Sequence, residues 1–171
     1  MAVERMDTER LILRKPIPED WELFRAFTMS ERSQYIRDEM PDLGKAWRMF
    51  ATEFGHWEIR GWGMFTVTLK GDDTALGMVG PWYPEDWPET EIGWLMFEGG
   101  EGKGFAFEAA HATITHAWRD LGWTEMVSYI DPENVRSYRL AERLGATLDP
   151  NAERVDPEDL VYRHPKPEGL Q

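Results

Sequence analysis

The chain has 171 residues, of which 42% are hydrophobic and 13% aromatic, which is enough apolar surface for a buried core and excludes a disordered chain. A net charge of −13 argues against a protein that reads the phosphate backbone of nucleic acids. Because the sequence contains no cysteine, it offers no disulfide, no thiolate nucleophile and no thiolate metal ligand.

The hydropathy pattern predicts a soluble, cytoplasmic protein without a membrane partner or a bound metal. No apolar run reaches the ~20 residues that a membrane-spanning helix needs, and the charged segment 1–10 lacks the apolar stretch of a signal peptide. The absence of cysteine fits a reducing compartment. The acidity of the chain either aids its solubility or attracts cationic partners such as protonated amines.

The first third of the chain contains a strand pattern and two helix patterns. Residues 8–14 place Leu11 and Leu13 on one face and are predicted to form a strand. A helix is predicted to begin at Pro18, since proline suits the first helical turn. From residue 43 the apolar positions have the spacing of an amphipathic helix with a wide buried stripe: Ala46, Trp47, Phe50, Ala51 and Phe54.

The middle of the chain has the pattern of a hairpin followed by another strand. Strands are predicted at residues 63–69 and 75–79, on either side of a turn at 71–73. Residues 81–88 are rich in proline and tryptophan and are predicted to be a loop, and residues 90–97 a strand.

The last third begins with a glycine cluster and a helix at 105–121. A strand at 126–130, a short helix capped by Asn134 and a last strand at 161–163 complete the prediction. The order of these elements predicts a single α+β domain over residues 1–171, with strands covered by helices.

The glycine cluster fits neither of two common phosphate-binding motifs. A P-loop would need a glycine where Phe97 stands and a hydroxyl where Gly104 stands, and a dinucleotide fingerprint would need a glycine in place of Phe107. What remains is a strand, a glycine loop and the N-terminus of a helix, whose free N–H groups favour a phosphate, with Lys103 adding a charge. The alternative is a glycine-rich turn without a ligand.

Several segments together carry a resemblance to a known family. They are TERLILR at 8–14, EIGW at 91–94, GKGFAFEA at 102–109, DPENVRS at 131–137 and LGA at 144–146. In this order and spacing they resemble the GNAT superfamily of acetyl-CoA-dependent N-acetyltransferases, most closely its ribosomal-protein alanine and serine N-terminal acetyltransferase branch. The resemblance implies a mixed, mostly antiparallel central sheet flanked by helices, and acetyl-CoA as the co-substrate.

The resemblance also implies where acetyl-CoA binds. The pyrophosphate loop of the family reads Arg/Gln-x-x-Gly-x-Gly/Ala; its two glycines match Gly102 and Gly104, whereas Gly99 stands at the Arg/Gln position. In the family the pantetheine arm pairs with the preceding strand as an added β-strand would. The residues predicted to bind acetyl-CoA are Leu95, Met96, Phe97, Gly102, Lys103, Gly104, Phe105, Ala106 and Asn134.

Acetyl transfer to a protonated amine needs a general base. The resemblance favours Glu91, at the start of the cofactor strand, and burial beside Trp82 and Trp94 would raise its pKa towards the working range. The alternative is a solvated glutamate at a strand edge. Three histidines are rival candidates for the base, of which the first two are expected to serve packing or solvation: His111, His116 and His164.

The leaving thiolate needs a proton or a hydrogen-bond donor. Many relatives use a tyrosine seven residues after the asparagine at the helix start, but here that position is Ala141. The more similar branch has a serine three residues after it, which is Ser137, and Tyr138 is the reserve candidate. Alternatively, the Ser137 hydroxyl bonds back to the helix carbonyl before it.

The predicted function is transfer of acetyl from acetyl-CoA to a primary amine by direct attack, the amine being a protein N-terminus or a small molecule. Tryptophans and carboxylates in the middle of the sequence would suit a cationic amine, although tryptophans more often form core and interfaces. They are Trp57, Trp62, Trp82, Trp87 and Trp94 with Glu85, Asp86, Glu89 and Glu91. The alternatives are a non-catalytic acyl-CoA-binding regulatory module on the same fold and an interaction protein that uses its tryptophans. An exposed aromatic patch would allow a homodimer.

Overall fold

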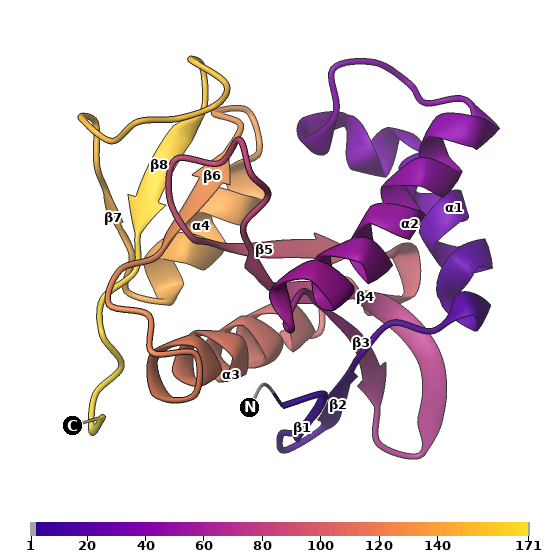
Figure 1. The fold of residues 1–171 in the computed structure, drawn as a ribbon, viewed down its shortest axis with the longest axis horizontal. Helices are drawn as coiled ribbons and strands as arrows, with labels where there is room; N and C mark the ends of the chain where they lie inside the picture. Colours follow the sequence, from indigo (N-terminus) through magenta and orange to yellow (C-terminus); the bar gives the residue numbers. More distant parts are fainter. Residues whose placement is uncertain (1–2, 171) are drawn as a thin grey trace.

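The computed structural model describes residues 3–170; residues 1, 2 and 171 of the predicted domain lie outside the described part. Its centre is an eight-stranded sheet in the order β1-β2-β3-β4-β5-β6-β8-β7 (Figure 1). Every neighbouring pair is antiparallel except β5 and β6, which are parallel. The predicted mixed, mostly antiparallel sheet flanked by helices is confirmed.

The strands are β1 (Arg5–Asp7), β2 (Leu11–Arg14), β3 (Phe65–Leu69), β4 (Asp72–Trp82), β5 (Glu91–Met96), β6 (Val127–Ile130), β7 (Thr147–Leu148) and β8 (Leu160–Arg163). The helices are α1 (Trp21–Thr28), α2 (Leu43–Arg60), α3 (Phe105–Arg119) and α4 (Val135–Arg143). Three short 3-10 helices connect them: η1 (Pro18–Asp20), η2 (Glu31–Ile36) and η3 (Glu98–Gly100).

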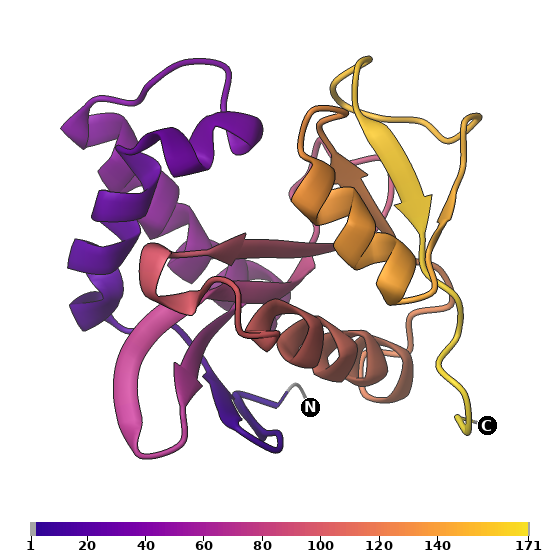
Figure 2. The same ribbon diagram turned by 180° about the vertical axis from the view of Figure 1, so that it is seen from behind.

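Helices cover the sheet on both faces (Figures 1 and 2). Consecutive residues of a strand point to opposite faces, and in β4 Met78 packs with α1 and α2 while Val79 packs with α3. The α1–α2 side is rich in aromatic residues, among them Phe24, Phe27 and Phe50. Strand β5 therefore lies between two hydrophobic layers, one on each face of the sheet.

Strand β4 extends two residues further into the proline-rich segment than predicted. Pro81 lies within β4 and is paired with Ile92 of β5, so the predicted loop at 81–88 was wrong at its start. The pairing of β3 with β4 ends at Val79, so Pro81 has a neighbouring strand only on the β5 side. The missing N–H of proline therefore leaves no carbonyl of β3 without a partner. The short strands β1 and β7 were not predicted, since three and two residues carry no periodic signal.

Helix α2 buries a different stripe from the predicted one. Ala46, Phe50, Glu53 and Trp57 are all buried, at the spacing of one helix face, whereas Trp47 is 58% exposed. Placing Trp47 in the stripe was therefore wrong. The position that completes the buried stripe is occupied by a glutamate, which no pattern of apolar residues reveals.

The parallel strands β5 and β6 touch at one point and then separate. Their register contains the single pair Glu91 and Val127. Beyond it, the Ser128 hydroxyl donates a hydrogen bond to the Ile92 carbonyl across 2.6 Å, while β6 continues as a full antiparallel partner of β8. The edge of β5 that faces β6 is consequently left open over most of its length.

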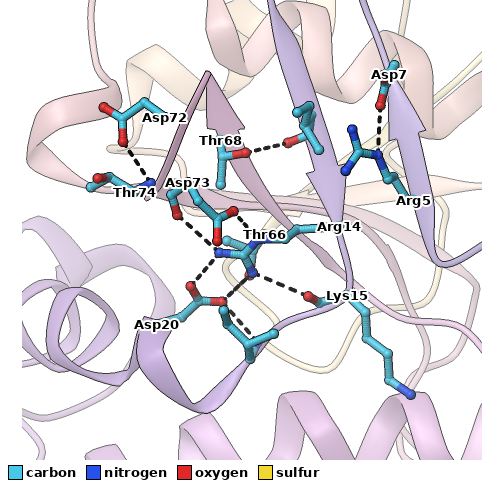
Figure 3. Close-up of polar contacts among 12 residues, drawn as sticks. Arg5, Asp7, Arg14, Lys15, Asp20, Thr66, Thr68, Asp72, Asp73 and Thr74 are labelled. Atoms are coloured by element: carbon cyan, nitrogen blue, oxygen red, sulfur yellow. Dashed lines mark hydrogen bonds and ion pairs between the residues drawn. The ribbon is translucent and has the colours of Figure 1, made fainter. Parts of the chain in front are cut away.

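A buried ion pair fixes the chain where it enters α1 (Figure 3). The Asp20 carboxylate accepts hydrogen bonds from both terminal nitrogens of Arg14, at 2.8 and 2.9 Å, and from the hydroxyl of Thr66 at 2.8 Å. It also accepts from the backbone N–H of Ile17 at 3.1 Å. The cluster therefore ties β2 and β3 to η1 and so to α1.

We predict that Asp20→Ala destabilises the protein by about 3 kcal/mol or more, because it leaves the guanidinium of Arg14 buried without its main partner. The free energy of unfolding in urea measures the effect. Asp73→Asn is the matched control: Asp73 also pairs with Arg14 but its side chain is 69% exposed, so the loss should stay below about 1 kcal/mol. Equal losses in the two variants would contradict this assignment.

Candidate active site

A cavity of about 510 Å³ lies where β5 and β6 separate. Its walls come from α1, η2, α2, the end of β4, β5, β6, the start of α4 and the segment before β8. Segments from both ends of the chain therefore meet around β5. Glu91 and Ser137, predicted to be catalytic, both line this cavity, together with Asn134.

Glu91 lies at the first position of β5, opposite Trp82 of β4. Its carboxylate accepts a 2.6 Å hydrogen bond from the indole Nε1 of Trp87 and a longer one, 3.4 Å, from the backbone N–H of Tyr129. A turn between Pro84 and Trp87 brings this indole over the carboxylate. Sequence reasoning chose Trp82 and Trp94 as the neighbours and missed Trp87, since a loop tryptophan gives no signal of where its ring points.

Burial raises the pKa of Glu91 to about 7. The hydrogen bonds from Trp87 and Tyr129 favour the ionised form and lower the pKa, while the negative charge of Asp159 raises it. A carboxyl with a pKa near neutrality can take a proton and release it again at physiological pH. This is the property expected of a general base.

A second carboxyl, Glu53 of α2, lines the same cavity. It is 6% exposed, and among residues 3–170 no group donates a hydrogen bond to its carboxyl. Burial alone raises its pKa to about 8. Sequence reasoning missed this residue, although one signal was present: a glutamate three residues after Phe50 and four before Trp57, both on the buried face.

The lining of the cavity is strongly acidic. Among residues 3–170, its carboxylate residues are Asp38, Glu53, Glu91, Asp131, Asp156 and Asp159, and its only cationic residue is Arg37. The Arg37 guanidinium already donates to the Ser33 hydroxyl at 2.7 Å and the Ser30 carbonyl at 3.1 Å. Burial, with the charges of Asp156 and Asp131, raises the pKa of Asp159 to about 6. Such a lining attracts cations and repels anions.

The glycine loop leads directly into α3, as predicted from the sequence. Gly102 and Gly104 have φ values of 75° and 78°, in the left-handed region that favours glycine, and Gly104 is the N-cap of α3. No group among the described residues accepts from the backbone N–H of Gly102, Lys103 or Gly104. The loop thus presents several free donors beside the positive end of the α3 dipole, next to the first helical residues Phe105 and Ala106.

The segment before β2 holds the glycine loop in place. Arg10 donates to the Lys103 carbonyl at 2.9 Å and forms a salt bridge of 2.7 Å with Glu108 of α3. Glu108 also accepts from the Thr8 hydroxyl at 2.6 Å and from the backbone N–H of Arg10 at 2.8 Å. Two of the sequence segments that carried the family resemblance are therefore in direct contact.

The open edge of β5 presents alternate residues. The Ile92 carbonyl faces β6, so by the alternation of a strand the main chain of Trp94 and Met96 faces the same open side. Leu95 pairs with Met78 of β4. Phe97 donates its N–H to Leu76 and accepts from Gly100 at its carbonyl, so its main chain is already hydrogen-bonded in both directions.

At the start of α4, Asn134 caps the helix by accepting from the Ser137 backbone N–H. The Ser137 hydroxyl accepts a 3.2 Å hydrogen bond from the Trp94 indole and donates to no described carbonyl, so the back-bond considered from sequence does not form. Ala141, where many relatives carry tyrosine, is fully buried. Tyr138 stacks on Tyr162 and does not line the cavity.

None of the three histidine candidates for the base lines the cavity. His111 is exposed, and His116 is buried and bonded to Asp120 at 2.8 Å. His164 is buried behind β6 and contacts the Ser128 hydroxyl at 2.8 Å. Burial lowers the pKa of His164 to about 4, so it stays neutral near pH 7. Within residues 3–170 no cluster of three or more His, Asp or Glu has an arrangement that could hold a metal ion.

Comparison with known protein families identifies the family of this chain. Residues 10–147 match the family described as acetyltransferase (GNAT) domain. The chain belongs to the GNAT acetyltransferase family. The resemblance drawn from the sequence segments is thus confirmed for the family. No helix in the described part of this GNAT chain is both long and apolar enough to cross a membrane.

Known relatives agree with this family. The GNAT chain is 39% identical to an acetyltransferase from Agrobacterium tumefaciens strain C58, whose crystal structure superposes with a TM-score of 0.89 over 96% of this chain and 95% of that one. It is 30% identical to the uncharacterized N-acetyltransferase YnaD of Bacillus subtilis over 82 residues, 47% of this chain. That match spans about half of YnaD, 48% of its length.

A more distant structure shares the fold. The ribosomal L7/L12 alpha-N-protein acetyltransferase RimL, in complex with coenzyme A, superposes with a TM-score of 0.69 over 94% of this chain and 96% of RimL. The sequence identity is 16%, so this likeness extends to the fold and not to the substrate.

We predict that Glu53→Gln changes how the stability of the GNAT protein depends on pH. Between its ordinary pKa of 4.5 and about 8, Glu53 is ionised in the unfolded chain but protonated in the folded one, so the free energy of unfolding falls as the pH rises, by up to about 1.4 kcal/mol per pH unit. Glutamine does not titrate. The Tm of the variant minus that of the wild type should therefore increase from about pH 5 to about pH 8, as measured by thermal unfolding at matched ionic strength.

Glu58→Gln is the control for this comparison. Glu58 lies on the same helix, but its side chain is 75% exposed and pairs with Lys15. The Tm of the Glu58→Gln variant should change with pH in the same way as that of the wild type. Parallel curves for wild type and Glu53→Gln would show that Glu53 titrates near its ordinary pKa.

Proposed function

We propose that this protein transfers the acetyl group of acetyl-CoA to a primary amine by direct attack, with Glu91 as the general base. One observation carries the proposal: a carboxyl whose pKa burial has raised to about 7 lies in the cavity beside the open edge of β5. Strands from both ends of the chain complete the sheet around this cavity, so we also propose that the whole chain is one catalytic domain.

The acetyl-CoA site that we propose follows the free donors of the main chain. The N–H groups of Gly102, Lys103 and Gly104, with those of Phe105 and Ala106 at the helix start, would bind the pyrophosphate. The choice of coenzyme A as the ligand is supported by RimL, a protein of the same fold whose structure is a complex with it.

The pantetheine arm would pair with the side of β5 that β6 leaves open, chiefly at Met96 and, by alternation, Trp94. Leu95 lines the cavity and would contact the arm through its side chain, since its main chain pairs with β4. Phe97, whose main chain is also already bonded, packs on Phe24 and Phe27 and is only 4% exposed. Asn134 would border the arm while it caps α4.

The proposed reaction has three steps. The acceptor ammonium gives a proton to the Glu91 carboxylate, and the free amine attacks the thioester carbon. A tetrahedral intermediate forms, whose oxyanion a free N–H on the open edge of β5 stabilises. Its collapse breaks the carbon–sulfur bond, the nitrogen gives its second proton to the departing thiolate, and the Ser137 hydroxyl, held by Trp94, donates a hydrogen bond to that sulfur. The sequence contains no cysteine that could carry a covalent acetyl intermediate.

The acidic lining supports a cationic acceptor. Six carboxylate residues face the cavity, whereas Arg37 is bound to neighbouring oxygens. Ammonium ions are attracted by such a field, and the aromatic lining residues Trp82 and Trp94 would add cation–π stabilisation.

We predict that Glu91→Gln lowers kcat/KM for the amine by about 100-fold or more, since removing a general base typically has an effect of this size. In the wild type kcat/KM should rise as the pH increases through about 7, because the base acts in its ionised form, and this rise should be absent in the variant. Thiol release from acetyl-CoA with a panel of primary amines measures both. Tight acetyl-CoA binding by wild type without turnover on any amine would instead favour a non-catalytic acyl-CoA-binding module.

Glu85→Gln is the control for this variant. Glu85 lies on the connection between β4 and β5, six residues before Glu91, pairs with Arg60 and has a side chain that is 97% exposed. The Glu85→Gln variant should keep the wild-type rate and the wild-type dependence of kcat/KM on pH. A Glu91→Gln enzyme with the same profile would refute the role of Glu91.

We predict that Gly99→Gln tightens binding of coenzyme A roughly three- to tenfold by restoring one side-chain hydrogen bond to the pyrophosphate. The position accepts a side chain, because an added Cβ would meet only Leu76 at 3.9 Å, an ordinary contact. Isothermal titration calorimetry with coenzyme A measures the change. Gly100→Gln is the contrasting variant, since its Cβ would lie 2.3 Å from the Leu76 carbonyl oxygen, and it should lose stability. An unchanged affinity in Gly99→Gln would contradict the proposed position of the pyrophosphate.

A further inference from the structure

Glu53 is a buried acid that the proposed acetyl transfer does not use. It lies in the centre of the buried stripe of α2, between Phe50 and Trp57, where an apolar side chain would stabilise the fold. Its Oε2 atom is fully buried and has no hydrogen-bond partner in the described part of the chain. A buried carboxyl without a partner is destabilising, so its presence in a cavity wall indicates a ligand that supplies the partner.

The two carboxyls that line the cavity, Glu53 and Glu91, are separate groups. Glu91 is held by donors of its own, Trp87 and Tyr129, whereas Glu53 has none. No hydrogen bond joins them, and they belong to different elements, α2 and β5. The cavity therefore offers two distinct positions for a cationic or donor group.

Apolar and aromatic side chains supply much of the remaining wall. Four of them belong to one hydrophobic cluster: Met49 of α2, Met64, Trp82 at the end of β4 and Leu95 of β5. Such a surface suits methylene groups and offers no further charge partner. The geometry combines the buried Glu53 and the proposed base Glu91 with an apolar wall, whereas the other four carboxylate residues of the lining are half-buried or exposed.

We infer that Glu53 determines acceptor specificity: it releases its proton to solvent and forms an ion pair with the second ammonium group of a linear aliphatic diamine, whose first amine is acetylated at Glu91. The inference rests on the proposed function, since it adds a second contact in the same cavity. A monoamine, or a peptide whose α-amine is followed by a neutral amide, would leave the Glu53 carboxyl without a charge partner. A diamine satisfies both carboxyls and places its methylenes against the apolar wall.

The first test measures binding and needs no turnover. Wild type, Glu53→Gln and Glu58→Gln are titrated calorimetrically with α,ω-diaminoalkanes from propane to octane and with n-alkylamines of the same lengths. Wild type should prefer the diamine by about tenfold or more at one optimal length, as expected for a hydrogen-bonded buried ion pair. In Glu53→Gln this preference should fall to about twofold or less, because the amide carries no charge. Glu58→Gln should keep it, because Glu58 is exposed on the same helix.

The second test measures acetyl transfer to the same amines, plus a short peptide with a free N-terminus, as the ratio of kcat/KM for diamine to that for monoamine. Each ratio compares two substrates on one variant, so a general loss of stability or activity does not change it. The ratio should be large in wild type and in Glu58→Gln and should collapse in Glu53→Gln.

The outcomes separate the two proposals. An equal ratio in wild type and Glu53→Gln, or a wild type that prefers the peptide or the monoamines, overturns the role of Glu53 while the acetyltransferase function stands. Diamine binding that depends on Glu53, without transfer to any amine, overturns the catalytic function but supports the diamine site.

Discussion

The separation of β5 from β6 is the constraint on which the whole site depends. The two strands share one register pair, at Glu91, and β6 is then held by β8 on its far side while Ser128 spans the gap to Ile92. If the ladder continued, β6 would fill the open edge of β5 and close the cavity. Because it stops, one element presents both a free main-chain edge and the carboxyl of Glu91.

Desolvation raises the pKa values of the two glutamates in this cavity. Glu91 is enclosed but keeps two donors, and its pKa rises to about 7, whereas Glu53 has no donor and its pKa rises to about 8. The same physical cause therefore yields two carboxyls with different properties in one cavity. Both make the folded state less stable as the pH rises, and a site of this kind is retained where a ligand or a reaction needs it. The hydrophobic layers on either side of the sheet offset that cost.

Two sets of polar contacts fix the position of elements around the cavity and of the glycine loop. On one side, the buried pair of Arg14 and Asp20 fixes the entry to α1, which contributes Phe24 to the cavity wall. On the other side, the contacts of Glu108 with Thr8 and Arg10 fix the glycine loop and the start of α3. Arg14 and Asp20 are only six residues apart, but Asp20 also accepts a hydrogen bond from Thr66, 46 residues away. Glu108 and Thr8 are 100 residues apart, so long-range contacts hold both the entry to α1 and the glycine loop.

The sequence by itself determined the helices, the longer strands, the glycine loop and the family, because periodicity, left-handed glycines and motif spacing are local properties of the chain. It also gave Glu91 and Ser137 as site candidates, through resemblance. Only the tertiary structure decided that Trp87 donates to Glu91, that Trp47 is exposed, and that Glu53 lies unpaired in the cavity wall. These facts depend on which distant segments remove water from a side chain or give it a partner, and burial and pKa are set by that surrounding protein rather than by neighbours in the sequence.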